Sequence, residues 1–149
     1  MRAVVQRVTW AEVEVEGKTV GKIGPGLCVL VGVEAGDGEK DAVYLAEKLA
    51  KLRIFADEEG KMNRSLLDTG LSALLVSQFT LLGDARGQNR PGFTRAEAPE
   101  QANALFAHCL ETVRRLGVPA ESGVFRAHMA VRLENDGPVT LLLDSRKLF

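Results

Sequence analysis

The first third of the chain alternates hydrophobic and polar positions with the two-residue period of β-strands. This alternation, or a short apolar run in its place, predicts four strands, over residues 2–9, 11–16, 19–23 and 27–33. Gly17–Lys18 and Gly24–Pro25–Gly26 separate the last three of these strands and have the composition of turns. Two turns so close together predict a β-meander at the start of the chain.

Two later segments have the period of a helix instead. Asp37 is the expected N-cap of a first helix over residues 38–53, and Pro99 marks the start of a second helix that ends at Gly117. The apolar positions of each helix fall on one stripe, made of Ala42, Leu45, Ala46, Leu49 and Leu52 in the first and of Leu105, Phe106, Cys109, Leu110 and Val113 in the second. Each helix should therefore bury one face against a sheet.

Between the helices, residues 71–76 form a near-continuous apolar run, which predicts a strand buried on both faces. Ser77-Gln78-Phe79-Thr80-Leu81 follows with two hydroxyls, an amide and an aromatic ring, and residues 83–92 then have the composition of a loop. Functional sites often lie where a rigid strand meets such a loop. The same pattern also fits a strand end whose polar side chains only face water.

Near the C-terminus, two further strands, residues 130–133 and 139–143, flank Asn135-Asp136-Gly137-Pro138. An Asp-Gly pair between strands favours a tight hairpin, and Asn135 and Asp136 can hydrogen-bond their own backbone there. Pro138 has no N–H to donate and fits poorly at the start of a central strand. These residues therefore predict a hairpin that closes the sheet.

The order of the elements is strands, helix, strand, helix, strands. It predicts an α/β fold in which a curled, barrel-like mixed sheet carries two main helices packed outside. A length of 149 residues fits a single domain over residues 1–149.

Composition excludes some classes of protein and leaves the function open. With 46% hydrophobic and 26% charged residues the chain resembles an ordinary globular protein, and it has no apolar run long enough to cross a bilayer and no signal segment. A cytoplasmic location is therefore expected, and Cys28 and Cys109 are expected to be core residues. The net charge of −1 indicates no broad nucleic-acid surface. Arg86, Arg90 and Arg95 could form a local basic patch, or could be solvated arginines balanced by nearby acids.

Side chains that usually carry catalysis are scarce. His108 and His128 are the only histidines, no pair of residues has metal-ligand spacing, and no Gly-x-Ser-x-Gly motif occurs. We therefore expect neither a metal nor a cofactor. Ser77 and Thr80 are the best-placed hydroxyls, but a hydroxyl is a weak nucleophile without a neighbouring base.

Ser77-Gln78-Phe79-Thr80-Leu81 and Asn135-Asp136-Gly137-Pro138-Val139-Thr140 resemble the two signature motifs of the D-aminoacyl-tRNA deacylases, also called D-tyrosyl-tRNA deacylases. The resemblance covers essentially the whole chain in order, because further matching stretches lie at residues 1–8, 24–32, 52–55, 61–63 and 90–91.

The resemblance implies a compact, barrel-like α/β enzyme that works as a homodimer on the 3′ end of aminoacyl-tRNA, without a cofactor, a membrane or DNA. Its reaction would be hydrolysis of the ester bond of D-aminoacyl-tRNA, and also of mischarged glycyl-tRNA. Ser77, Gln78, Phe79 and Thr80 would form the catalytic motif. The backbone N–H groups of Phe79 and Thr80 would stabilise the oxyanion, and the terminal ribose hydroxyl would assist cleavage.

The second motif would provide the selectivity for D-amino acids. The resemblance implies that Gly137–Pro138 is a cis dipeptide inserted into the pocket of the partner subunit, where its two carbonyls receive the α-ammonium group of the substrate. Arg7 would anchor this dipeptide, and Phe125 and Met129 would line the pocket.

The chain departs from the family pattern in two places. Arg126 stands where a glycine is usual and His128 where an acid is usual, so the local backbone and charge should differ. The loop after the first motif has Arg86-Gly87-Gln88 in place of a lysine-glycine and Gly92 in place of a serine, so contacts with the tRNA end should also differ. Two other functions stay open: a hydrolase with Thr80 as covalent nucleophile, and a non-catalytic module that binds tRNA ends.

Overall fold

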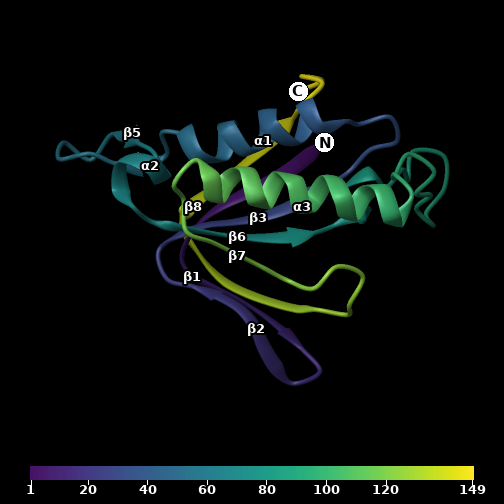
Figure 1. Cartoon of the computed structure of the whole chain (residues 1–149), viewed down its shortest axis with the longest axis horizontal. Helices are drawn as coiled ribbons and strands as arrows, with labels where there is room; N and C mark the ends of the chain where they lie inside the picture. Colours follow the sequence, from purple (N-terminus) through teal and green to yellow (C-terminus); the bar gives the residue numbers. More distant parts are fainter.

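A computed structural model describes residues 1–149. The chain forms a six-stranded mixed sheet, a two-stranded ribbon, three α-helices and one 3₁₀ turn (Figure 1). The sheet contains β1 (Arg2–Val15), β2 (Lys18–Ile23), β3 (Gly26–Gly32), β6 (Ser72–Ser77), β7 (Ala120–Ser122) and β8 (Ala130–Asp144). The other elements are α1 (Glu39–Lys51), β4 (Phe55–Ala56), β5 (Met62–Arg64), α2 (Leu66–Thr69), η1 (Phe79–Leu82) and α3 (Pro99–Arg115). None of the helices is long and apolar enough to cross a membrane.

The predicted fold class is confirmed. Helices α1 and α3 contact each other over one face of the sheet, while β1, β2 and β8 curve away from them (Figure 1). The curl brings β2 back against β6 and β7. The approach is close at Gly21 of β2, where an added Cβ atom would lie only 2.7 Å from the carbonyl oxygen of Ser122 in β7. The sheet therefore has the nearly closed, barrel-like shape that the element order predicts.

The prediction of a meander is wrong. β2 and β3 both pair antiparallel with β1, β2 with residues 11–15 and β3 with residues 2–8, so they follow each other along one edge of β1. Gly24–Pro25 bends the chain between β2 and β3 without reversing it. At the bend a Cβ atom on Gly26 would lie 1.8 Å from the carbonyl oxygen of Ser72, so only glycine allows this close approach.

The predicted C-terminal hairpin is also wrong. Both halves of β8 pair with β1, with Gln6 opposite Thr140 and Val8 opposite Asn135. The four residues Asp136–Val139 therefore lie opposite the single residue Arg7, and we call them the 136–139 bulge. The chain does not reverse here because β1, at 14 residues, is long enough to pair with both halves.

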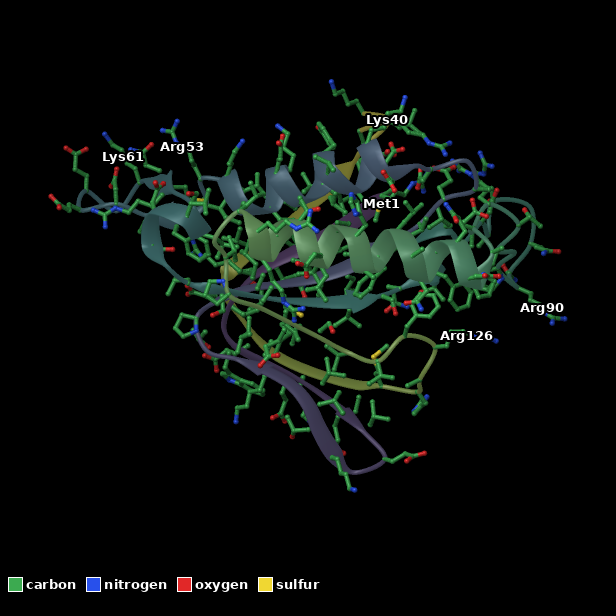
Figure 2. All side chains as sticks on the ribbon, viewed as in Figure 1. Met1, Lys40, Arg53, Lys61, Arg90 and Arg126 are labelled. Carbon is green, nitrogen blue, oxygen red and sulfur yellow. The ribbon has the colours of Figure 1, made fainter.

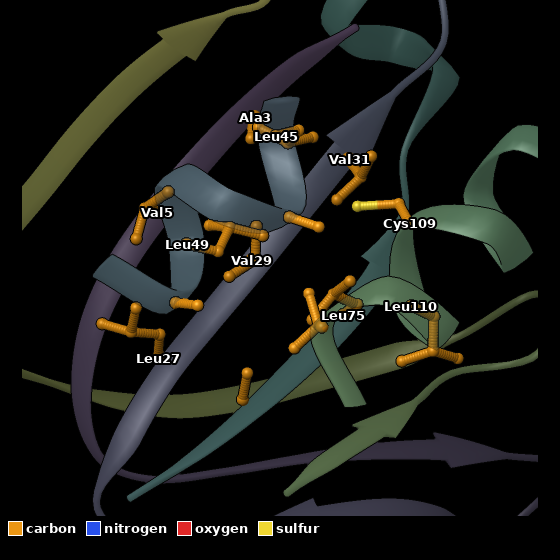
Figure 3. Packing of buried hydrophobic residues seen from close by; sticks show 14 of the residues in the cluster. Ala3, Val5, Leu27, Val29, Val31, Leu45, Leu49, Leu75, Cys109 and Leu110 are labelled. Atoms are coloured by element: carbon orange, nitrogen blue, oxygen red, sulfur yellow. The ribbon is translucent and has the colours of Figure 1, made fainter. Parts of the chain in front are cut away.

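Two hydrophobic cores form on the two faces of the curled sheet. The larger lies between the sheet and the helices, and Figure 3 shows Leu45 and Leu49 of α1 and Cys109 and Leu110 of α3 packing towards the strands. Both predicted helical stripes are buried, except that Leu52 is only partly buried. The smaller core fills the inside of the curl and consists of Val8, Ala11, Val13, Ile23, Cys28, Leu74 and Val76.

The expected N-cap at Asp37 is wrong as well. Helix α1 begins after Gly38, whose N–H group donates to Asp41 Oδ2 at 2.9 Å. The buried Asp37 carboxylate instead accepts from the Glu34 N–H group (2.7 Å) and forms ion pairs with the Met1 amino group (2.7 Å) and Arg146 (3.0 Å). The nearby cations and the Glu34 amide compete successfully with the helix terminus for this carboxylate.

Both cysteines should be unreactive in the folded protein. Burial raises the pKa of Cys28 to about 11 and that of Cys109 to about 12. Since only the thiolate reacts, roughly one Cys28 side chain in 10⁴ is ionised at pH 7. We expect a thiol reagent at pH 7 to label neither cysteine in native protein and both in denaturant, as measured by mass spectrometry. Equal labelling rates under the two conditions would contradict their burial.

Candidate functional site

A pocket opens where the parallel strands of the sheet end. β3, β6 and β7 are parallel neighbours, so their carboxyl ends meet at one edge of the sheet, which is where α/β folds commonly bind ligands. The cavity there has a volume of about 490 Å³, within the usual range of small-molecule sites. We call it the strand-end pocket. It is lined by Val31, Val33, Val76, Ser77, Gln78, Phe79, Ala96, Glu97, Pro99, Ala102, Phe106, Phe125, Arg126, Ala127, His128, Met129 and Val131.

The structure brings five of the predicted site residues together in this pocket. Ser77, Gln78 and Phe79 line it from the end of β6, and Phe125 and Met129 line it from the segment between β7 and β8. These two segments are far apart in the sequence. Thr80 follows in η1, next to the lining residues but outside the lining itself.

The first motif has a defined backbone geometry. The Gln78 N–H group donates to the Val31 carbonyl at 2.7 Å, which fixes the turn from β6 into η1. The first N–H groups of a helical turn have no acceptor inside it, and here they belong to Phe79 and Thr80, which no side chain caps. The Gln78 side chain donates to the Thr80 hydroxyl. Backbone donors without a cap therefore lie beside the pocket.

The exposed ring of Phe79 packs edge-on against Phe93, with ring centroids 5.1 Å apart. Phe93 follows the loop that closes at Asp84 and Gly92, where each residue donates its N–H group to the carbonyl of the other at 2.8 Å. This contact attaches the loop to the rim of the pocket.

Two ionisable side chains in the lining could take part in proton transfer. The Glu97 carboxylate accepts from the N–H groups of Ala98 (2.8 Å) and Gly36 (3.1 Å), and these bonds hold the pKa of Glu97 below its ordinary value. Glu97 is therefore a poor proton acceptor. His128 is exposed and forms no side-chain hydrogen bond. No group of three or more His, Cys, Asp or Glu side chains is arranged to hold a metal ion.

The second motif lies elsewhere, in the exposed 136–139 bulge. The Gly137–Pro138 peptide bond is cis, as the resemblance implies. Arg7 fastens one end of the bulge, because its Nε donates to the Asp136 carbonyl (3.2 Å) while Nη1 donates to the Ile54 carbonyl (2.7 Å). Asn135 fastens the other end by accepting from the Val139 N–H group at 2.8 Å.

The bulge and the strand-end pocket of one chain do not meet. In the strand register, Arg7 of β1 pairs with Leu27 of β3, and Leu27 pairs with Ala73 of β6. Ser77 lies four residues further along β6. At about 3.3 Å per residue this is a separation of about 13 Å along the strands, besides the width of the strands β1 and β3 that lie between β8 and β6. Neither Gly137 nor Pro138 lines the pocket.

Sequence reasoning missed the helical wall of the pocket. Glu97, Pro99, Ala102 and Phe106 belong to this wall, yet the sequence pattern predicts only a helix start at Pro99 and a core position at Phe106. An apolar residue that lines a cavity and one that fills a core have the same helical spacing, so no pattern separates them.

The structure defines the backbone conformation of Arg126 and the ion pairs of two of the three loop arginines. Arg126 has a φ of 65°, in the left-handed region that costs an ordinary residue about 1–2 kcal/mol, which accounts for the glycine that is usual there. Of the three candidates for a basic patch, Arg86 is paired with Asp84 and Arg95 with Glu34. Only Arg90 is left without an ion pair.

A family model and curated relatives both identify one family. A family model described as D-Tyr-tRNA(Tyr) deacylase matches residues 4–144. The chain is 59% identical to a D-aminoacyl-tRNA deacylase of Syntrophomonas wolfei and 59% identical to one of Anaeromyxobacter dehalogenans, each over 149 residues and the full length of both chains. Among solved structures it is similar to the c-Myc DNA unwinding element binding protein, with 41% identity, a TM-score of 0.91 and coverage of 97% of this chain and 98% of that one.

Proposed function

This chain belongs to the D-aminoacyl-tRNA deacylase family, whose members are ester hydrolases, and we propose how its main-chain groups and the RNA together cleave the substrate. The substrate is D-aminoacyl-tRNA, together with mischarged glycyl-tRNA, and the products are free amino acid and tRNA in the cytoplasm. The observation that carries the proposal is the strand-end pocket with Ser77, Gln78 and Phe79 on its wall.

The ester carbonyl binds at the start of η1. Uncapped N–H groups of Phe79 and Thr80 can donate to the oxygen that becomes negatively charged when the carbonyl is attacked. Such fixed donors need no reorganisation during the reaction. The mostly apolar lining behind them takes the amino-acid side chain, with Phe125 and Met129 on the opposite wall.

No side chain of the motif can activate a nucleophile. Thr80 accepts a hydrogen bond from Gln78, and a neutral amide cannot take up the proton of an attacking hydroxyl. Two backbone N–H groups lower the pKa of Glu97, so its carboxylate is too weak a base to take up that proton. We therefore assign the assisting group to the substrate: the ribose hydroxyl next to the ester orients a water molecule, which adds to the carbonyl. The ester C–O bond then breaks, and the leaving ribose oxygen takes up the proton that the attacking water releases.

Discrimination between D- and L-amino acids uses a main-chain wall. The two forms carry the same groups, so only shape can separate them. The carbonyls of Gly137 and Pro138 receive the α-ammonium group, and an L side chain would collide with this wall. Glycine has no side chain and is not rejected. Because the bulge is remote from the pocket of its own chain, the wall comes from a second copy, and the active form is a homodimer.

If the ribose hydroxyl assists cleavage, the rate should depend strongly on that hydroxyl and only weakly on the Thr80 side chain. Thr80→Ala should keep activity within about 10-fold of the wild type, because its hydroxyl carries no proton. A substrate whose terminal ribose lacks the 2′-hydroxyl should be cleaved at least about 100-fold more slowly, which is the usual contribution of an assisting acid or base. Single-turnover rates on both substrates measure the two effects.

The opposite pattern identifies the covalent alternative. A Thr80→Ala variant that loses on the order of 10⁶ in rate, with equal cleavage of the deoxy substrate, would mean that Thr80 is the nucleophile. A wild-type protein that binds tRNA but cleaves neither D- nor L-aminoacyl-tRNA would be a binding module. His108→Gln is a suitable control, since His108 lies on α3 outside the pocket lining and its variant should keep near wild-type activity.

A further inference from the structure

Two arginines of the chain have no acceptor within the protein. Ten of the twelve arginines form an ion pair or donate a hydrogen bond to another residue, and the two that do neither are Arg90 and Arg126. Both side chains belong to exposed residues. Guanidinium groups that lack an internal partner are available to an external anion, which they can bind with two parallel hydrogen bonds.

One of these arginines lines the strand-end pocket, and the other lies in the loop beside its rim. Arg126 is part of its lining. Arg90 lies in the loop that closes at Asp84 and Gly92, and the next aromatic residue after this loop packs against Phe79 of the lining. In Figure 2 the two labelled arginines project outward at the same end of the molecule, where α3 begins.

The acids near the pocket form no ion pair with these two arginines. Asp84 is paired with Arg86, and Glu34 is paired with Arg95. Glu97 is bound to two backbone N–H groups of its surroundings. Both guanidinium groups are therefore unpaired, although the chain as a whole has a net charge of −1 and Glu97 adds one negative charge to the pocket lining.

The backbone at Arg126 gives independent support. Its left-handed φ of 65° is a conformation that arginine rarely adopts. A long charged side chain at this position is unfavourable for folding, and strained positions of this kind concentrate where a side chain serves a ligand.

We infer that Arg126 and Arg90 bind phosphate groups of the unpaired 3′-terminal nucleotides of the substrate, Arg126 the phosphate next to the esterified nucleoside and Arg90 one further along the strand. This inference rests on the proposed function. With the ester at η1, the polynucleotide has to leave the pocket through its mouth, past these two residues. Phosphate contacts of this type position a nucleic acid without reading its sequence.

The test compares Arg126→Ala and Arg90→Ala with Arg115→Ala in the homodimeric enzyme. Arg115 is a matched control, since it is exposed and pairs only with Glu111 of its own helix. On D-tyrosyl-tRNA at low salt, each of the first two variants should lose about 10-fold in kcat/KM. The slope of log kcat/KM against log salt concentration should become shallower by about 0.7 for each contact removed. Arg115→Ala should change neither quantity.

A substrate without phosphate separates this effect from damage to the pocket. On the D-tyrosyl ester of adenosine, Arg90→Ala should equal the wild type, and Arg126→Ala should lose far less than it does on tRNA. Arg126→Gly relieves the backbone strain and should show the same loss of kcat/KM on tRNA as Arg126→Ala. A loss in the glycine variant therefore cannot come from misfolding. Arg126→Lys should keep most of the salt dependence.

Three kinetic results would contradict phosphate binding by Arg126 and Arg90. The inference is wrong if the two variants behave as Arg115→Ala on tRNA, or if they lose as much on the adenosine ester. It is also wrong if the loss occurs only with D-aspartyl substrates, adenosine ester included, since the anion would then be the amino-acid carboxylate. Failure of the proposed function looks different: the wild type would cleave neither the tRNA nor the adenosine ester, and the inference would fall with it.

Discussion

Gly137→Ala should slow the cleavage of D-aminoacyl-tRNA by at least about 100-fold, because a displacement of about 1 Å in a binding wall has an effect of this size. An added Cβ atom would lie 2.9 Å from Val139 Cγ2 and 3.1 Å from Arg7 Nη2, and the φ of 128° does not suit an L side chain. The wall that should receive the α-ammonium group would therefore shift. The variant should not gain activity on L-aminoacyl-tRNA, because the bulge would still obstruct an L side chain.

Rates with D- and L-tyrosyl-tRNA check this expectation, and Gly24→Ala is a matched control. Gly24 has open space around its Cβ position and an ordinary backbone conformation, so its variant should keep wild-type activity. A Gly137→Ala protein with normal D-substrate turnover would contradict the main-chain wall.

Mixing two inactive variants tests whether the wall acts on the second subunit. Ser77→Phe fills the pocket but leaves the bulge intact, and Gly137→Ala does the reverse. After subunit exchange, half of the dimers should be mixed, and each mixed dimer has one intact site, so about a quarter of wild-type activity should return. Dilution that dissociates the dimer should abolish it. A mixture that stays inactive, or a fully active monomer, would exclude a shared site.

Asp37→Ala should lower the free energy of unfolding by about 3–5 kcal/mol, the cost of removing one partner from a buried ion pair. The Met1 amino group and Arg146 would lose their counter-charge, and the Glu34 N–H group would lose its acceptor. For a chain of this length the midpoint of thermal unfolding should fall on the order of 10 °C.

Asp84→Ala is the matched control for this prediction. Asp84 also pairs with an arginine, Arg86, but that side chain is 84% exposed, so water screens the pair. Its removal should cost less than about 1 kcal/mol. Urea unfolding curves of the two variants give the comparison, and a loss at Asp37 no larger than that at Asp84 would contradict a structural role for the buried cluster.

Periodicity along the chain predicted the helices because it depends on near neighbours. Both apolar stripes fall on the faces that the structure buries, with Leu52 at the edge. The predicted N-cap at Asp37 is wrong because this carboxylate forms ion pairs with Met1 and Arg146. Both partners are distant in the sequence, so no local pattern predicts these contacts.

Strand pairing depends on partners far apart in the sequence, and there the predictions failed. Asp136–Gly137 has the composition of a tight turn, and the chain does depart from regular pairing there. Whether such a turn closes a hairpin or bulges from one strand depends on β1, more than 120 residues earlier. The same is true of Gly24–Pro25, where β1 accepts β2 and β3 along one edge.

The candidate site was predictable only through family resemblance. Ser77 and Phe79 end a strand in a way that many structural strands do, and nothing in their pattern links them to Phe125 and Met129. The structure places all four in one pocket, while their roles stay predictions. The lack of an ion pair at Arg126 could not be recognised before the partners of the neighbouring acids were known.

The 136–139 bulge is held between two ladders of the same strand, since β1 pairs with residues 140–144 on one side of it and residues 130–135 on the other. Arg7 and Asn135 fasten its two ends. A segment of four residues closed in this way has little conformational freedom to lose when it meets another surface. Association of the bulge with a partner should therefore cost little conformational entropy. The amide proton of Val139 should exchange slowly with solvent even in the free chain.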